Sequence, residues 1–212
     1  MQTIEFAIYL QFFLGLVAAV NPVGIMPVFV SLTSHMTPEE KIKTATTANI
    51  GVAVILIVSL IAGQALLDMF SISLDSFRVA GGLLLMSIAF SMMSGKIGED
   101  KQNKQERTAH ISREQIGIVP LAMPLMAGPG AISSVIVFGS RYPTWFDTFA
   151  IAITVIAFSF CSWLLFRSAP LIVRFLGQTG INVITRIMGL ILAALGIEFI
   201  ANGVRNLFPG LA

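Results

Sequence analysis

The sequence predicts an all-α integral membrane protein with six transmembrane helices, arranged as a 3+3 inverted repeat with helices 1 and 4 broken at the midplane. Three observations predict this fold: the apolar composition, the spacing of the charged residues, and a proline-glycine motif that occurs twice. Of the 212 residues, 56% are hydrophobic and 11% are charged, whereas soluble domains carry roughly 25% charged residues. A chain this short cannot bury that apolar excess in a water-soluble core, so its solvent is lipid.

Uncharged stretches mark the expected membrane spans, because a helix needs about 20 apolar residues to cross a hydrocarbon core roughly 30 Å thick. Their continuous apolar character excludes the alternating pattern of a membrane barrel. The N-terminus has no basic segment of the signal-peptide kind, so the first span is expected to be retained. The spans are predicted at residues 6–34, 44–67, 79–95, 115–140 and 148–166, with a sixth from Ile187 to about Phe208.

The hydrophilic stretch 96–114 is predicted to be a charged cytoplasmic linker between a first repeat, residues 1–95, and a second repeat, residues 115–212. Ten Lys and Arg residues fall in loops on one side of the predicted membrane and three on the other. The positive-inside rule therefore places the linker in the cytoplasm and both termini in the periplasm. A net charge of +2 gives no reason to expect a nucleic-acid partner.

Two landmarks recur at nearly the same offset. Pro22 and Pro129 are 107 residues apart, and Arg78 and Arg186, each followed three residues later by glycine, are 108 apart. Because three spans is an odd number, the second copy must lie upside down relative to the first. This pattern is typical of the inverted repeats of secondary transporters.

Each recurring proline lies at the middle of its span, within Asn21-Pro22 and Gly128-Pro129. A proline inside a helix removes a backbone hydrogen bond at a cost of about 3 kcal/mol, and lipid cannot satisfy the freed groups. Asn21 is expected to cap a new half-helix that begins at Pro22. Nearby glycines favour an unwound break over a simple kink: Gly24, Gly128 and Gly130.

The two breaks predict a binding site. Half-helix N-termini present free N–H groups and a partial positive charge that suit a carboxylate, while the C-termini present carbonyls that suit an ammonium group. The expected ligand is a small zwitterion. Proline kinks that serve only helix packing are the alternative. The predicted substrate-binding residues are Asn21, Pro22, Gly24, Asn49, Gly128, Pro129, Gly130, Ser133 and Ser134.

Three charged residues are candidates for coupling or gating. Glu198 follows Arg186 by twelve residues, about 18 Å along a helix, and a charge at that depth suggests a function. It is either a proton-coupling carboxylate or a side chain that reaches outward and pairs with Asn202 and Arg205. Arg78 and Arg186 are either gates or interfacial anchors. Proton and sodium coupling are both left open.

Enzyme signatures are absent from the sequence. There is no metal-ligand motif and no catalytic constellation, and the single cysteine, Cys161, excludes an intrachain disulfide. We therefore expect no cofactor and no metal. A passive channel for a small solute or ion, and a membrane scaffold, are the alternatives to a transporter, and a homo-oligomer is left open.

Two segments resemble the MarC family of bacterial inner-membrane proteins. They are Asn-Pro-Val-Gly-Ile-Met-Pro-Val-Phe at 21–29 and Pro-Leu-Ala-Met-Pro-Leu-Met-Ala-Gly-Pro-Gly-Ala-Ile at 120–132, together with Arg-Val-Ala-Gly-Gly at 78–82. The resemblance implies six spans, an inner-membrane location and kinship with the lysine-exporter superfamily. It also implies a secondary transporter that exports or exchanges small neutral amino acids.

Overall fold

The computed structural model describes residues 6–94 and 126–208, and within these ranges the chain forms helices and no β-strand. The predicted linker 96–114 and the first part of the predicted fourth span lie outside the described residues. The prediction of an all-helical membrane protein is confirmed. The helices are α1 (Phe6–Val20), α2 (Pro22–Leu32), α3 (Pro38–Met69), α4 (Leu74–Ser94), α6 (Pro129–Arg141), α7 (Trp145–Arg167) and α8 (Ala169–Leu207).

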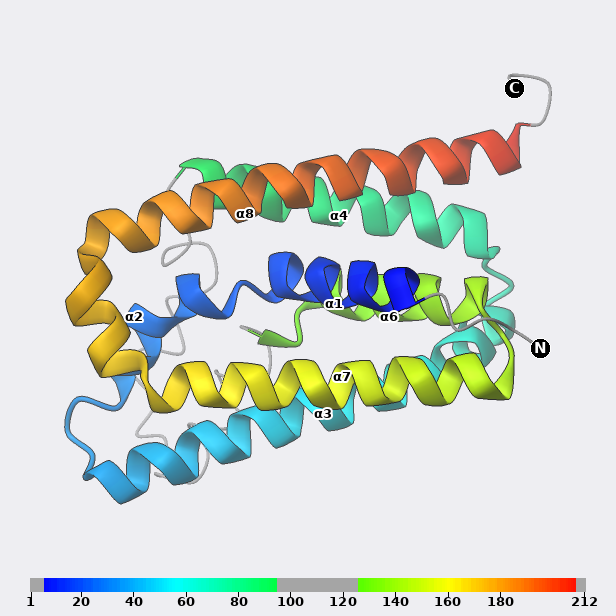
Figure 1. Ribbon diagram of the computed structural model, residues 1–212. Coiled ribbons are helices and arrows are strands. Elements are labelled where there is room, and N and C mark those ends of the chain that lie inside the picture. The colour runs from blue at the N-terminus through cyan, green and yellow to red at the C-terminus, as the bar shows by residue number, and fades with distance from the viewer. Residues whose placement is uncertain (1–5, 95–125, 209–212) are drawn as a thin grey trace.

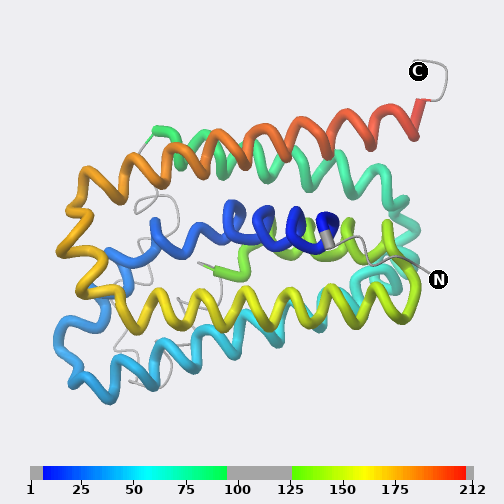
Figure 2. The backbone as a smooth tube through the Cα atoms, in the orientation of Figure 1, coloured from blue at the N-terminus to red at the C-terminus, as the bar shows by residue number. Residues whose placement is uncertain are grey.

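The helices lie roughly along one direction, with α1 and α6 in the middle (Figure 1). On one side of this centre α4 packs against α8, and on the other side α3 packs against α7. Helices α2 and α6 both begin partway along the bundle, between its two ends (Figure 2). The two central helices therefore contact both flanking pairs.

Four helices, α3, α4, α7 and α8, are each long and apolar enough to cross a membrane, and the bent pair α1 and α2 forms a fifth candidate span. Large apolar side chains cover the outside of the bundle, among them Ile61, 70% exposed, and Leu190, 65% exposed. A water-soluble surface rarely carries such extended apolar patches. The exterior is therefore built to face lipid.

Helix α3 begins as its sequence predicts, with Pro38 in the first turn. The N–H of Glu40 donates to Thr37 Oγ1 at 3.3 Å, and the N–H of Thr37 donates to Glu40 Oε2 at 2.8 Å. This reciprocal capping box satisfies two backbone donors that the first helical turn leaves free. Pro38 thus has a local structural role.

Helix α8 begins earlier than the predicted sixth span. It starts at Ala169 and bends at Gly177, which has a left-handed φ of 62°. Its first turns run across one end of the bundle, and the remainder follows α4 (Figure 1). The predicted sixth span begins at Ile187 because the charged residue Arg186 sets the boundary of the span. That start is wrong, since Arg186 lies inside α8 and is exposed. A long arginine side chain tolerates such a position because its charge can reach the interface.

The contact between α4 and α8 depends on glycine. A Cβ atom on Gly82 would lie 2.7 Å from the carbonyl oxygen of Gly196, and a Cβ on Gly196 would lie 2.9 Å from the carbonyl oxygen of Gly82. Gly189 and Gly203 extend the same contact along α8. Small residues let membrane helices approach this closely, so α4 and α8 form a tightly packed wall of the bundle.

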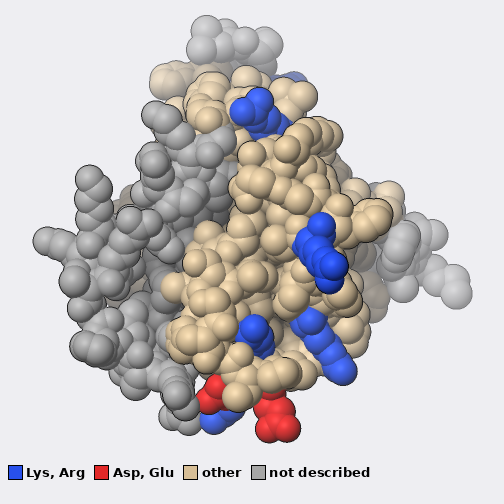
Figure 3. Space-filling view, turned by 90° about the vertical axis from the view of Figure 1, so that its left-hand side faces the viewer, with Lys and Arg blue, Asp and Glu red and all other residues tan. Residues whose placement is uncertain are grey.

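Basic side chains gather at one end of the bundle, the left-hand side of Figure 1 (Figure 3). This end holds the start of α3, with Lys41 and Lys43, and the junction of α7 and α8, with Arg167 and Arg174. The opposite end holds the turns between α3 and α4 and between α6 and α7.

Candidate functional site

The first break is a capped helix start. The axes of α1 and α2 differ by 42°, and Asn21 between them adopts a left-handed conformation with φ 48° and ψ 63°. The N–H of Gly24 donates to Asn21 Oδ1 at 3.3 Å, and Pro22 is the first residue of α2. The predicted cap at Asn21 and the predicted half-helix beginning at Pro22 are confirmed. Asn21 is only 3% exposed, so this break faces protein.

The same asparagine ties the break to α8. Asn21 Nδ2 donates to Thr185 Oγ1 at 3.4 Å, across 164 residues of sequence. Gly24 lies against this pair, since a Cβ atom there would meet the Asn21 amide and would lie 2.8 Å from Thr185 Oγ1. Sequence analysis missed Thr185. A polar residue beside the Arg-x-x-Gly motif of α8 was the available signal.

The second break has a different start. Helix α6 begins at Pro129, and Gly128 before it is extended, with φ −73° and ψ 172° and no side-chain cap. Ser134 donates to the carbonyl of Gly130 at 2.8 Å. Ser133 is buried against Gly81 of α4, where a Cβ would lie 3.0 Å from the Ser133 Cβ. Within residues 6–94 and 126–208, no side chain caps the backbone N–H groups at the start of α6.

A cavity of about 430 Å³ lies among α1, α4, α6 and α8. It brings together three of the predicted residues, Arg78, Ser134 and Glu198. The other predicted residues do not line it: Asn21, Pro22, Gly24, Asn49, Gly128, Pro129, Gly130, Ser133 and Arg186. The cavity and the two helix breaks are therefore separate features of the bundle.

One face of α8 supplies the polar wall of the cavity. Glu198, Asn202 and Asn206 all line it, and their spacing of four residues places them on one helix face. Sequence analysis grouped Glu198 with Asn202 and Arg205, but Arg205 does not line the cavity and Asn206 does. The i, i+4, i+8 spacing was the signal that identifies Asn206.

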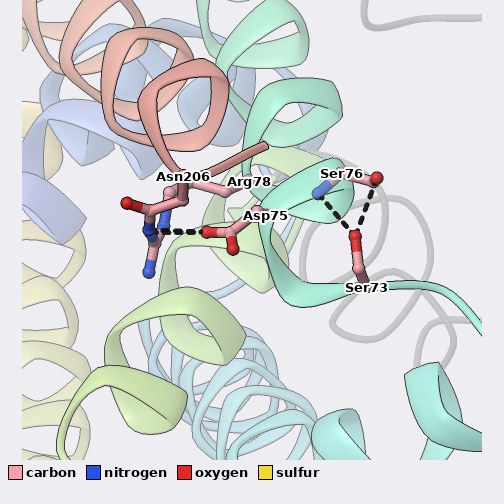
Figure 4. Close-up of polar contacts among 5 residues, drawn as sticks. All are labelled: Ser73, Asp75, Ser76, Arg78 and Asn206. Atoms are coloured by element: carbon pink, nitrogen blue, oxygen red, sulfur yellow. Dashed lines mark hydrogen bonds and ion pairs between the residues drawn. The ribbon is translucent and has the colours of Figure 1, made fainter. Parts of the chain in front are cut away.

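Arg78 is held in the cavity wall by Asp75 of its own helix, and Asp75 also bonds Asn206 of α8 (Figure 4). Arg78 Nη1 donates to Asp75 Oδ1 at 3.0 Å, and Asn206 Nδ2 donates to the same oxygen at 3.0 Å. The side chain of Arg78 is only 12% exposed. Ser73 caps the first turn of α4 by accepting from the N–H of Ser76 at 3.1 Å. Asp75 thus neutralises Arg78 and links two helices.

Arg141 and Tyr142 at the end of α6 also line the cavity, and sequence analysis missed both. The guanidinium carbon of Arg141 lies 5.8 Å from the centre of the Tyr142 ring, within the range of a cation–π contact. The remaining walls are largely apolar and include Phe12, Phe138 and Leu195. The cavity therefore combines both signs of charge with an apolar lining.

Asn49 is buried on α3, at 4% exposed. Its Nδ2 donates to the carbonyl of Ala45 at 2.8 Å, and its Oδ1 has no partner within the described residues. No group of three His, Cys, Asp or Glu side chains that could hold a metal ion occurs in 6–94 or 126–208.

Comparison with known proteins places the chain in a family. Residues 6–208 match the family described as "MarC family integral membrane protein". The chain is 59% identical over 207 residues to "UPF0056 membrane protein YhcE" of Escherichia coli (strain K12), covering 98% of this chain and 96% of that protein. It is 36% identical over 204 residues to a "UPF0056 membrane protein" of Aquifex aeolicus (strain VF5), covering 96% and 95% of the two chains. No solved structure matches the chain significantly. The chain belongs to the MarC family of integral membrane proteins.

Proposed function

We propose that this protein is a multi-pass secondary transporter of the bacterial inner membrane that exports or exchanges small neutral amino acids. The observation that carries the proposal is the cavity of about 430 Å³ with charged, amide and hydroxyl groups inside an otherwise apolar bundle. Polar groups at membrane depth are costly and usually serve a function. The volume lies within the roughly 300–1,000 Å³ of small-molecule sites.

The proposed architecture is six transmembrane helices in two inverted repeats of three, with a break at the midplane in helices 1 and 4. Two observations support it. Helices α2 and α6 each begin with a proline partway along the bundle, and α4 and α8 each carry an Arg-x-x-Gly segment and pack against one another. In such transporters the substrate lies where the broken helices meet. We propose that the breaks bind the substrate and that the cavity, which Ser134 of α6 also lines, is a neighbouring polar entry into the bundle.

The proposed orientation has both termini in the periplasm. The end of the bundle that carries Lys41, Lys43, Arg167 and Arg174 is then cytoplasmic, as the positive-inside rule requires. The cavity is lined by Arg78 and Arg141, which lie toward the other end of the bundle, and in this orientation it opens toward the periplasm. Arg186 lies on the cytoplasmic side of this arrangement, where it acts as an anchor or gate.

Transport in proteoliposomes tests the proposal. We expect saturable uptake and counterflow of L-alanine, glycine or L-serine under a proton or sodium gradient. The double variant Pro22→Ala with Pro129→Ala should lower this flux about tenfold or more, because the half-helix starts depend on these prolines. Pro38→Ala is the matched control, since Pro38 also begins a helix but lies outside both breaks.

Absence of flux under either gradient would overturn the proposal. Flux that rises linearly with substrate and shows no counterflow would indicate a channel in place of a carrier. Substitutions at the breaks that leave flux unchanged would instead favour a scaffold.

Glu198 is the proposed coupling carboxylate, because it is the acidic residue that lines the cavity. Glu198→Gln should remove the dependence of transport on the proton gradient, since a neutral amide cannot take up a proton. Glu39→Gln, at the exposed start of α3, is the matched control. Proton dependence that survives Glu198→Gln would exclude this role.

A further inference from the structure

Two charged side chains in the cavity, those of Arg141 and Glu198, have no oppositely charged partner in the part of the chain that the structure describes. Arg78 is matched by Asp75 at 3.0 Å, but Arg141 on α6 and Glu198 on α8 form no ion pair within 4.0 Å with any described residue. The guanidinium group of Arg141 lies over the aromatic ring of Tyr142. Both side chains are exposed on the isolated chain, so both are accessible to a solute.

Arg141 ends α6 and Glu198 lies within α8, and both line the same cavity. An oppositely charged ligand group can form a charge-assisted hydrogen bond with each of them. A ligand with a single charge would match one of the two residues and leave the other unmatched. A ligand that carries both charges satisfies Arg141 and Glu198 at the same time. The cavity therefore selects for a zwitterion by charge.

We infer that the cavity among α1, α4, α6 and α8 is itself a zwitterion-binding site, in which Arg141 binds the carboxylate and Glu198 binds the ammonium group. This inference rests on the proposed function and adds a second, peripheral site to the one at the helix breaks. Arginine suits the carboxylate because its planar guanidinium can donate two parallel hydrogen bonds. A carboxylate that holds an ammonium cannot hold a proton at the same time, so this role is compatible with coupling by Glu198.

The rest of the lining indicates which zwitterions fit. Asn202 and Asn206 supply neutral hydrogen-bonding groups beside Glu198, and Phe12 and Leu195 supply apolar walls. The third cavity charge, on Arg78, is already neutralised by Asp75. A charged substrate side chain would thus find no free partner, and the site favours amino acids with small, uncharged side chains.

Asp75 is a positioning residue for this selectivity. It accepts from both Arg78 and Asn206 (Figure 4), and so it neutralises the charge that Arg78 would otherwise present to a ligand. Asp75→Asn leaves Arg78 unneutralised and adds a free positive charge to the cavity wall. This variant should gain affinity for anions, which a purely structural role of Asp75 does not predict.

Ligand-induced thermal stabilisation of the purified full-length chain in nanodiscs tests the inference. The probes are L-alanine, N-acetyl-L-alanine, which lacks the positive charge, and L-alaninamide, which lacks the carboxylate. We expect the wild-type chain to bind L-alanine in preference to both analogues. Arg141→Gln and Glu198→Gln should each weaken alanine binding about tenfold or more, the loss of one charged hydrogen-bonding partner.

The analogues separate the two roles. Arg141→Gln should no longer discriminate against alaninamide, Glu198→Gln should no longer discriminate against N-acetylalanine, and Asp75→Asn should bind N-acetylalanine more tightly than the wild-type chain does. Arg205→Gln, on α8 but outside the cavity, and Glu39→Gln are matched controls expected to behave as wild type. Arg141→Lys and Glu198→Asp, which keep the charges, should retain the analogue preference even where a neutral variant fails to fold.

Several outcomes overturn the inference: no stabilisation by alanine, stabilisation by a singly charged analogue equal to that by alanine, or an unchanged analogue preference in Arg141→Gln and Glu198→Gln. Flux measurements on the same variants in proteoliposomes keep it separate from the proposed function. Alanine binding with the predicted charge preference but without flux overturns the transporter and supports this site. Flux with an unchanged analogue preference in the variants overturns this site and supports the transporter.

Discussion

The starts of α2 and α6 look alike in the sequence and differ in the structure. Both helices begin with a proline, which is followed two residues later by Gly24 in α2 and is flanked by Gly128 and Gly130 in α6. At α2, Asn21 is left-handed, caps the helix and bonds Thr185 of α8. At α6, Gly128 is extended and has no side-chain cap. The first start is therefore fixed by side-chain contacts, whereas the second has no side-chain cap.

This difference shows that the proline determines where each helix starts. The residue before the proline determines whether side-chain hydrogen bonds hold that start in place. An asparagine tolerates the left-handed region and offers both an acceptor and a donor, so Asn21 can cap its own helix and hold another. A glycine offers neither. At α2 the Asn21 side chain already accepts from a backbone N–H group, and at α6 no side chain caps the helix. If substrate binds at the breaks, we therefore expect its carboxylate to bind the N–H groups at the start of α6.

The largest expected effect is that of Gly24→Ala. Its Cβ would meet the Asn21 amide and lie 2.8 Å from Thr185 Oγ1, two groups held by hydrogen bonds. We expect the free energy of unfolding in mixed detergent micelles to fall by about 2–3 kcal/mol. Gly130→Ala is the matched variant at α6. Its Cβ would meet the ends of Ile88 and Leu85 at 2.8 and 3.1 Å, and these flexible side chains can move, so the loss should be about 1 kcal/mol or less. Equal losses would refute the comparison.

The next effect is that of Asn21→Ala, which removes the cap and places alanine in a left-handed conformation. We expect a loss of about 2 kcal/mol in the same unfolding assay. Asn21→Gly keeps the backbone conformation accessible and should lose less, which isolates the contribution of the cap. Gly128→Ala should change stability by about 0.5 kcal/mol or less, because φ −73° suits alanine and no cap is lost. A large loss at Gly128 would show that the second start is also fixed.

The smallest effect is that of Thr185→Val, which removes the acceptor for Asn21 Nδ2 at 3.4 Å. A single hydrogen bond of this length should contribute about 1 kcal/mol or less. Thr154→Val on α7 is the control, because Thr154 bonds only the carbonyl of Ala150 in its own helix, at 2.9 Å. A double-mutant cycle of Asn21→Ala with Thr185→Val should show coupling between the two residues. Additive losses would mean that the bond to α8 does not hold the break.

Local patterns accounted for most of the helices and for one break. The uncharged stretch 6–34 corresponds to α1 and α2, and Asn21-Pro22 predicted the exact cap that the structure shows. Such features depend on residues adjacent in the chain. The start of α8 was misplaced because Arg186 does not end a helix whose exposed face can carry it.

The sequence by itself determined that the chain lies in lipid, that it is helical, and where the chain bends, since composition, proline and capping act locally. Only the tertiary structure decided which charges meet. Arg141 and Glu198 lie on helices far apart in the sequence, and they line one cavity because α6 and α8 both border it. Asp75 neutralises Arg78 while Asn206 of α8 reaches the same carboxylate. The Asp75–Arg78 pair is a local i,i+3 contact within α4, whereas helix packing alone brings Asn206 to Asp75 and places Arg141 and Glu198 at one cavity.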